Sequence, residues 1–191
     1  MRETLRLILA VIVATVVSAV GLSATYSVTR DRIAEQERLR EEESLREVLP
    51  GAETFTRITD EEVVAKAEEV SEGVFVSLYR AQEGSATVGW AVRVEPRGYG
   101  GPIQMAVGLE SSGKVTGVSI ISLKETPGLG TKVQDDEFLA QFAGWDAERM
   151  DEQIKELDAV TGATKSSNGV RKGVLAASHV YAAVVATGEV E

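Results

Sequence analysis

The sequence predicts an α+β protein with an N-terminal membrane helix, a charged helix and a compact domain built on an antiparallel sheet. Three observations predict this fold. Residues 7–29 carry no charged side chain, residues 74–122 contain segments in which apolar and polar side chains alternate, and residues 166–187 repeat apolar side chains every three or four positions. These patterns are typical of a membrane span, of half-buried strands and of an amphipathic helix.

Composition excludes several classes of function. The 191 residues leave room for one domain and an appendage. The 20 Lys and Arg against 30 Asp and Glu give a formal net charge of -10, which argues against nucleic-acid binding because phosphates require clustered cations. The sequence has no cysteine, which excludes thiolate catalysis, disulfides and cysteine-ligated metal clusters. Its single histidine, His179, excludes a multi-histidine metal site.

The uncharged segment of residues 7–29 is long enough to cross a membrane, since a spanning helix needs about 20 residues. The alternative is a cleaved signal peptide whose basic start would be Arg2 and Arg6. We predict a retained anchor over residues 1–29, because the segment is longer than the apolar region of a usual signal peptide. Arginines flank both ends, so the positive-inside rule does not decide the orientation.

Residues 30–50 alternate arginine with aspartate and glutamate, a pattern typical of a solvated helix with ion pairs between its turns. Leu49-Pro50-Gly51 ends this helix. We therefore predict a juxtamembrane stalk over residues 30–50 and a compact domain over residues 51–191.

The compact domain is predicted to contain a meander of antiparallel strands, since short turns join its alternating segments. The expected strands are residues 74–80, 88–94, 103–109 and 114–122, with turns at 83–85 and 111–113. Helices are expected at 135–142 and 166–187. In the second helix, Val170, Val174, Ala177, Tyr181 and Val184 form one apolar stripe. Residues 173–186 are apolar enough to suggest a second span, but they are too few and include His179, so we predict a core helix.

Two loops of this domain have compositions that suit ligand binding. Residues 97–102 contain three glycines around Tyr99, which permit positive φ and a close approach of the backbone to a ligand. The alternative for this segment is a long hairpin loop. Residues 124–132 turn at Pro127-Gly128 and leave Leu129 exposed between glycines, beside possible hydrogen-bonding groups on Glu125, Thr126 and Lys132.

A third loop, residues 158–167, leads into the last helix and suits an anion. Free N–H groups and the dipole at a helix start favour a bound phosphate. Thr161, Thr164 and Ser166 add hydroxyls and Lys165 adds a cation. An ordinary helix cap would explain the same residues. The spacing does not match the phosphate-binding loop of nucleotide triphosphatases.

Together the three loops resemble the signatures of the extracytoplasmic FMN-binding domain family. Thr161-Gly162-Ala163-Thr164, with Asp158 three residues earlier, resembles the flavinylation motif, although many members have Ser at the position of Thr161. The segments 125–130 and 99–101 resemble the other two signatures. With one N-terminal span, the whole chain is similar to the G subunit of Rnf electron-transport complexes. The C subunit of the sodium-translocating NADH:quinone oxidoreductase shares these motifs but is usually longer.

The resemblance implies a flavoprotein whose FMN is bound covalently through a phosphoester to Thr164. It implies further flavin contacts, with Leu129 packing on the ring and Lys132 or Lys165 near oxygen atoms of the flavin. The expected contacts are Thr161, Gly162, Ala163, Lys165, Ser166, Tyr99, Gly100, Gly101, Glu125, Thr126, Pro127, Gly128, Leu129, Gly130 and Lys132. Asp158 is expected to be a recognition residue for a flavin transferase that uses FAD and Mg²⁺. No catalytic residue and no metal site are expected.

The resemblance also implies a redox subunit without activity of its own, in a complex that couples ferredoxin:NAD oxidoreduction to ion translocation. Its expected partners are other membrane subunits, including a second flavin-carrying subunit, and the transferase. The expected location is the cell membrane, with a single pass and the FMN domain on the extracytoplasmic side. Alternatives are the same role in a quinone reductase, an anchored non-redox module that binds a phosphate ligand reversibly, and a hydrolase with Thr164 as nucleophile, for which the sequence offers no adjacent base.

Overall fold

The computed structural model describes residues 2–190, and its contacts divide the chain into two units, residues 1–41 and 42–191. The first helix, α1 (Arg2–Val48), contributes to both units. The second unit combines an antiparallel sheet with helices, so the α+β class predicted from the sequence is confirmed.

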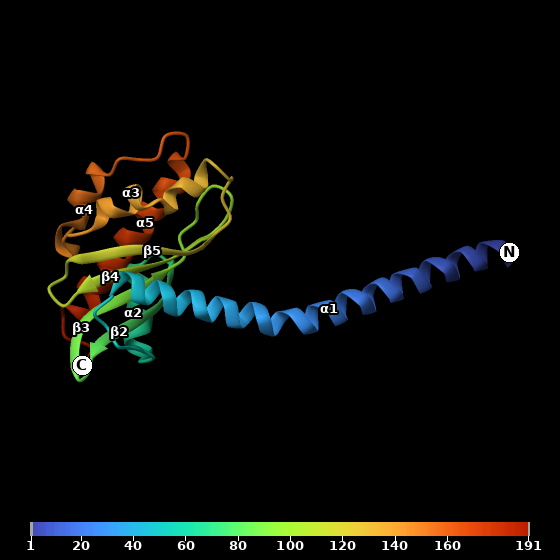
Figure 1. Ribbon diagram of the computed structural model, residues 1–191, viewed down its shortest axis with the longest axis horizontal. Coiled ribbons are helices and arrows are strands. Elements are labelled where there is room, and N and C mark those ends of the chain that lie inside the picture. The colour runs from blue at the N-terminus through green and yellow to red at the C-terminus, as the bar shows by residue number, and fades with distance from the viewer. Residues whose placement is uncertain (1, 191) are drawn as a thin grey trace. The chain divides into compact units, whose positions relative to one another are not determined.

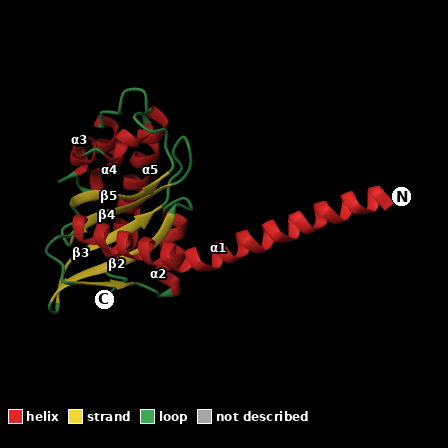
Figure 2. Ribbon diagram, turned by 45° about the vertical axis from the view of Figure 1, so that its right-hand side comes forward, coloured by secondary structure: helices red, strands yellow, loops and turns green. Residues whose placement is uncertain are grey.

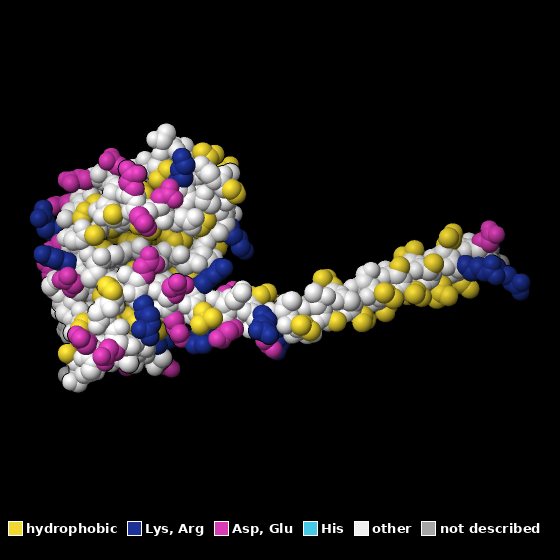
Figure 3. Space-filling view, in the orientation of Figure 1, with side chains coloured by type: hydrophobic (Ala, Val, Ile, Leu, Met, Phe, Trp, Pro, Cys, Tyr) yellow, Lys and Arg dark blue, Asp and Glu magenta, His cyan; other side chains and the backbone are white. Residues whose placement is uncertain are grey.

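In the first unit, α1 is exposed from Arg2 to Arg40, and its first half carries mostly apolar side chains (Figure 3). Within the described residues it is the one helix long and apolar enough to cross a membrane. The hydroxyls of Thr15 and Thr25 donate to carbonyls one turn earlier, so these polar groups are satisfied within the helix itself. Further along, Arg38 pairs with Glu35 at 2.9 Å, and its hydrogen bond and charge hold the pKa of that carboxyl below its ordinary value.

The second unit is built on an antiparallel sheet with the strand order β1-β2-β3-β4-β5, so neighbours in sequence are neighbours in the sheet (Figure 1). The strands are β1 (Thr54–Arg57), β2 (Phe75–Glu83), β3 (Ala86–Val94), β4 (Ile103–Glu110) and β5 (Val115–Leu123). The predicted meander of β2 to β5 is confirmed within a few residues at each end. Strand β1 was not predicted, because four mostly exposed residues give no clear alternation.

The helices of the second unit lie mainly in one layer (Figure 2). Helix α2 (Glu61–Val70) was not predicted, although Asp60 marks its start by accepting hydrogen bonds from the N–H groups of Glu62 and Val63. The predicted helix at 135–142 is broken into α3 (Asp136–Leu139) and a 3₁₀ turn. The remaining elements are α4 (Met150–Gln153), α5 (Thr164–Val180), a π-helical turn (Tyr181–Val185) and 3₁₀ turns at Gly130–Gln134, Ala140–Phe142, Ala147–Arg149 and Ile154–Glu156.

Helix α5 packs on the sheet through the predicted apolar stripe, all of which is buried. Gly173 makes this approach possible, since a Cβ at this position would lie 2.7 Å from the sulfur of Met105 on β4. The hydroxyl of Tyr181 donates to the carbonyl of Ser111 at 2.8 Å, and burial raises the pKa of this hydroxyl. The apolar segment 173–186 is thus a core helix, as predicted.

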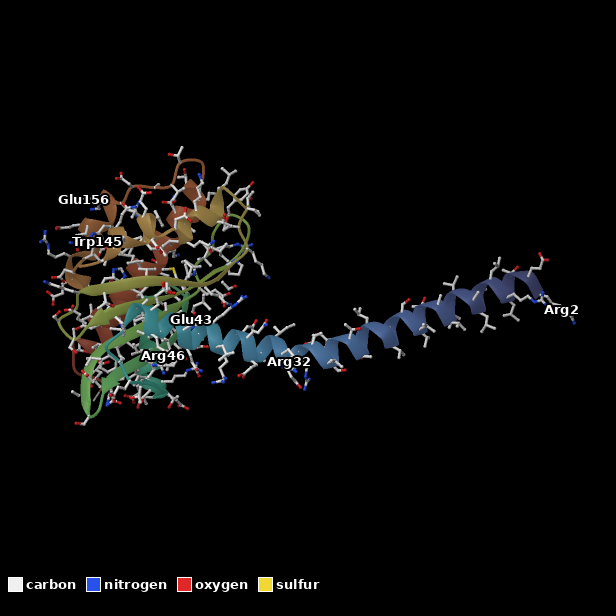
Figure 4. All side chains as sticks on the ribbon, in the orientation of Figure 1. Arg2, Arg32, Glu43, Arg46, Trp145 and Glu156 are labelled. Atoms are coloured by element: carbon white, nitrogen blue, oxygen red, sulfur yellow. The ribbon has the colours of Figure 1, made fainter. Side chains whose placement is uncertain are left out.

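The opposite face of the sheet is covered by the end of α1, where Figure 4 labels Glu43 and Arg46. Leu45, Val48, Leu49 and Ala52 form a buried cluster with three alanines of the sheet, Ala81, Ala91 and Ala106. Hydrogen bonds add to this contact. The hydroxyl of Ser119 donates to Glu47 at 2.6 Å, and that of Thr116 donates to the carbonyl of Val48. The compact unit therefore begins at Glu42, before the boundary at residue 51 that the sequence suggested.

We expect Leu45→Ala to destabilise the sheet unit, because Leu45 is only 3% exposed in this cluster. Truncation of a buried leucine costs about 2–5 kcal/mol. Denaturant unfolding of the full chain in detergent measures the change, with Leu39→Ala as the control because Leu39 is 50% exposed on the same helix. Equal unfolding free energies for the two variants would show that the end of α1 is not part of the folded unit.

Candidate functional site

A cavity of about 470 Å³ lies at the start of α5, and all three predicted loops contribute to it. Its size is in the range of small-molecule and cofactor sites. The lining residues are Tyr99, Glu125, Thr126, Leu129, Gly130, Gly162, Ala163, Thr164, Lys165 and Ser166. Segments far apart in the sequence therefore meet around one hollow, as expected of a single ligand site.

Two similar turns shape the walls of the cavity. In one, the N–H of Leu129 donates to the carbonyl of Thr126 at 3.2 Å, and Gly128 has φ +76°. In the other, the N–H of Ala163 donates to the carbonyl of Val160 at 2.9 Å, and Gly162 has φ +81°. A glycine with positive φ in the third position is the requirement of a type II turn. The predicted tight turn at Pro127-Gly128 is confirmed.

Glu125 joins two of the loops from inside the site. Its Oε1 accepts hydrogen bonds from the N–H groups of Tyr99 and Gly100, at 2.8 and 3.2 Å. Its Oε2 accepts from the hydroxyl of Ser166 at 2.8 Å. The residue is 8% exposed, so the carboxylate is buried with both oxygens engaged. Glu125 thus fixes the glycine-rich loop to the first turn of α5, a role that the sequence motif alone does not reveal.

The first turn of α5 has no side-chain cap. The helix begins at Thr164, two residues earlier than predicted, and the capping position is Ala163, which makes no side-chain hydrogen bond. The N–H groups of a first helical turn have no partner within the helix. The serines nearby are engaged elsewhere. Ser166 donates to Glu125, and Ser167 accepts from the N–H of Val160 at 3.0 Å. The alternative of an ordinary helix cap is therefore wrong.

Exposed groups at the mouth of the cavity supply a cation and apolar surface. Thr164 and Lys165 are exposed in the first turn of α5. The ammonium of Lys165 lies 5.4 Å from the ring centroid of Tyr99, within the range of a cation–π contact. Tyr99 is 68% exposed and Leu129 is 49% exposed, and among the described residues of the second unit these are the exposed large hydrophobic side chains.

The glycines of residues 97–102 act by close packing within the protein. The possibility of positive φ is not realised at Gly98, Gly100 or Gly101. A Cβ on Gly98 would lie 2.1 Å from Oε1 of Glu125, and one on Gly100 would lie 2.0 Å from the carbonyl oxygen of Lys124. The close approach of this backbone is to Lys124 and Glu125 of the neighbouring loop, and an approach to a ligand stays a prediction.

Lys132, Asp158 and Thr161 lie around a neighbouring cavity of about 400 Å³. Gly100, Gly101, Pro127 and Gly128 line neither of these two cavities. Asp158 is held there by Gln141, whose Oε1 accepts from the N–H of Asp158 at 3.0 Å and whose amide nitrogen donates to its carbonyl at 3.3 Å. No sequence signal indicated Gln141, because this contact depends on the tertiary fold.

The other residues considered from the sequence have structural contacts. Trp145, labelled in Figure 4, packs edge-on against Phe142 at 5.2 Å between ring centroids and does not line the larger cavity. His179 makes a hydrogen bond to Asp151 at 3.2 Å. Among residues 2–190, no group of three His, Asp or Glu side chains is arranged to hold a metal ion.

Comparison with known proteins defines the class to which this fold and site belong. The FMN-binding domain family matches residues 98–179, a range that includes all three loops except Arg97. The G subunit of the proton-translocating ferredoxin:NAD(+) oxidoreductase complex of Clostridium ljungdahlii is 30% identical over 83% of this chain and 80% of its own length. The G subunit of the Na(+)-translocating complex of Acetobacterium woodii is 31% identical over 86% of this chain and 85% of its own length. The chain belongs to this family of G subunits, known as the Rnf type.

Solved structures support the fold independently. The C subunit of the Na(+)-translocating NADH-quinone reductase from Parabacteroides distasonis has a TM-score of 0.56 at 15% identity, with 78% of this chain and 94% of that chain covered. NqrC of Shewanella oneidensis has a TM-score of 0.50 at 18% identity, covering 73% and 72%. The G subunits are 30 and 31% identical to this chain, whereas the quinone reductase subunits share its fold at 15 and 18% identity. The sequence comparison therefore favours the Rnf-type family. The chain is a membrane-anchored, FMN-binding electron-transfer protein.

Proposed function

We propose that Thr164 carries FMN through a phosphoester and that the protein relays electrons in an Rnf-type complex. The observation that carries this proposal is the uncapped start of α5, where exposed Thr164 is the first helical residue and opens onto the larger cavity. Free N–H groups and the positive end of the helix dipole favour a phosphate at this point. Lys165 adds a positive charge beside it.

The remaining cavity residues suit the flavin that the family binds. Leu129 and Tyr99 offer exposed apolar surface at the mouth, and Thr126 offers a hydroxyl. Glu125 and Ser166 have a different role, since their side chains are hydrogen-bonded to each other and hold the loops together. Lys132 and Thr161 lie on the neighbouring cavity, so we assign flavin contacts first to the residues of the larger one.

Attachment requires transfer of an FMN phosphoryl group to the protein. The hydroxyl oxygen of Thr164 attacks the FMN-side phosphorus of FAD held by a transferase with Mg²⁺. The new oxygen–phosphorus bond forms as the bond between the two phosphates breaks, AMP leaves, and the hydroxyl proton passes to a base of the transferase. The exposure of Thr164 supports this step, because a modifying enzyme must reach the hydroxyl. We assign Asp158, which is exposed on the same loop, to recognition by that enzyme.

Bound FMN supplies a centre that accepts and releases electrons singly or in pairs. This chain positions that centre and needs no acid or base of its own. Its relatives are subunits of complexes named for ferredoxin:NAD(+) oxidoreduction and for translocation of protons or Na⁺. We infer the same reaction here, with other membrane subunits as partners, among them a second flavin-carrying subunit. We place the FMN domain on the extracytoplasmic side, where a covalent bond prevents loss of the cofactor.

The intact mass of the denatured chain tests this proposal. Protein purified from its native membrane should exceed the sequence mass by one FMN less water, and the yellow colour should remain with the polypeptide after denaturation. Unmodified mass together with release of all flavin on denaturation would overturn covalent attachment and would leave reversible FMN binding.

We expect Gln141→Ala to slow flavin attachment, because its two hydrogen bonds fix the backbone of Asp158. Loss of two such bonds should lower the fraction of the protein that holds this loop in place for the transferase, and with it the attachment rate, by about tenfold or more. The measurement is the initial rate of covalent flavin incorporation with transferase, FAD and Mg²⁺. Gln134→Ala is the matched control, since Gln134 is exposed and outside this contact. Equal rates for the two variants would remove Gln141 from the process.

A further inference from the structure

Arg80 on β2 is a cation that the protein leaves without a charged partner in the described residues. Its guanidinium lies over the ring of Trp90 on the adjacent strand, at 5.2 Å from the ring centroid. Its Nε is buried and has no hydrogen-bond partner in the part of the chain that the structure describes. A buried polar atom without a partner is rare in folded proteins, because its desolvation is not compensated.

Arg80 lines a cavity of about 350 Å³ that is separate from the flavin site. Strand β1, the start of α2 and the residues after α5 complete the walls. Val190 lies beyond the C-terminal end of α5, whereas Thr164 begins that helix, so the two cavities lie toward opposite ends of α5. The other lining residues are Thr56, Arg57, Ile58, Thr59, Asp60, Val63, Glu189 and Val190.

Two cations and two carboxylates line this cavity, Arg57 and Arg80 against Asp60 and Glu189. Asp60 already accepts hydrogen bonds from two N–H groups of α2, and Glu189 forms an ion pair with Lys66. Arg57 is exposed and, like Arg80, has no ion pair among residues 2–190. Two guanidinium groups therefore border the cavity while both of its carboxylates are engaged. In a chain of net charge -10, a cavity whose arginines equal its carboxylates in number is more basic than the chain as a whole.

We propose that this cavity binds a small organic anion. Its carboxylate or phosphate group is held by Arg57 and Arg80, since guanidinium groups form paired hydrogen bonds with both kinds of anion. The hydroxyls of Thr56 and Thr59 lie on the same cavity. A short apolar body contacts Ile58, Val63 and Val190, which supply the apolar part of the wall. The site is independent of FMN.

Trp90 provides the readout, because an anion that engages Arg80 changes the charge over its ring. The chain has two tryptophans, and Trp145→Phe leaves Trp90 as the single one. The full chain with this substitution, in detergent, is titrated with butyrate at constant ionic strength set by chloride. We expect a saturable change in Trp90 emission. The same titration with 1-butanol should give none, and inorganic phosphate should bind at least about tenfold more weakly than butyrate, since it lacks the apolar body.

Variants connect this signal to the arginines. Arg57→Gln should weaken butyrate binding at least about tenfold, and this exposed residue can be replaced without disturbing the core. Arg80→Lys keeps the charge but loses the paired donors, so it should also weaken binding. Lys155→Gln, which removes an exposed cation outside this cavity, should bind as the parent does. No saturable signal in the parent, or equal binding by Arg57→Gln and Lys155→Gln, would overturn the proposal. A saturable response to 1-butanol as strong as that to butyrate would overturn it as well.

Discussion

Thr164→Ala should abolish covalent flavin while leaving the fold intact. The variant lacks the hydroxyl that we propose forms the phosphoester, so the mass of the denatured chain should match its sequence alone. Thr164 does not cap α5, because the capping position is Ala163, and its side chain is exposed. The free energy of unfolding should therefore change by no more than about 0.5 kcal/mol. This combination of complete loss of modification and unchanged stability distinguishes a modification site from a structural threonine.

Two further variants locate the attachment point. Thr164→Ser keeps a hydroxyl in the first turn of α5 and should remain modified. Thr161→Ala removes the neighbouring hydroxyl, which lies on the second cavity, and should retain flavin at Thr164. The measurement is the mass of the tryptic peptide that begins after Lys155. Flavin on the Thr164→Ala protein would refute our assignment, and its loss from Thr161→Ala alone would move the attachment to Thr161.

Much of the fold follows from local patterns. The alternation in β3 and β4 and the stripe of α5 each reflect burial on one face, so they predicted strands, helix and core together. The elements that were missed or misjudged have weaker local signals. Strand β1 is short and exposed, and its place at the sheet edge depends on pairing with β2. The end of α1 belongs to the sheet unit because small alanines form the opposing surface, a tertiary property that a charged stalk sequence does not reveal.

The candidate site was predicted in part, because residue types can be read from the sequence whereas contacts between loops depend on the tertiary fold. The three loops were identified from residue types, and their meeting around one cavity depends on the order of the strands. The roles of individual residues were harder to predict. Glycines in a loop permit positive φ, yet at Gly98 and Gly100 the constraint is the volume taken by Glu125 and Lys124. The contact of Gln141 with Asp158 could not be predicted either, because only the folded chain brings these two residues together.

Glu125→Gln should loosen the flavin site, because Glu125 joins the glycine-rich loop to the first turn of α5. The carboxylate accepts three hydrogen bonds, from two N–H groups and from the hydroxyl of Ser166. The oxygen of an amide can still accept from the two N–H groups, but its NH₂ group can only donate, so the hydroxyl of Ser166 would have to reverse and accept, and all three bonds would lose the carboxylate charge. The cost should be about 1–3 kcal/mol of unfolding free energy, measured by denaturant unfolding of the full chain. The FMN domain should also become more susceptible to proteolysis at residues 97–102.

A double-mutant cycle with Ser166→Ala separates the two halves of this contact. Ser166→Ala removes one donor and leaves the N–H groups of Tyr99 and Gly100 bonded, so it should cost less than Glu125→Gln. Because the two side chains are in direct contact, the double variant should be more stable than the sum of the single effects predicts, by about 0.5 kcal/mol or more. Strict additivity would show that Glu125 does not connect the glycine-rich loop to α5. Positive coupling would mean that one buried carboxylate holds both walls of the cavity where Thr164 begins its helix.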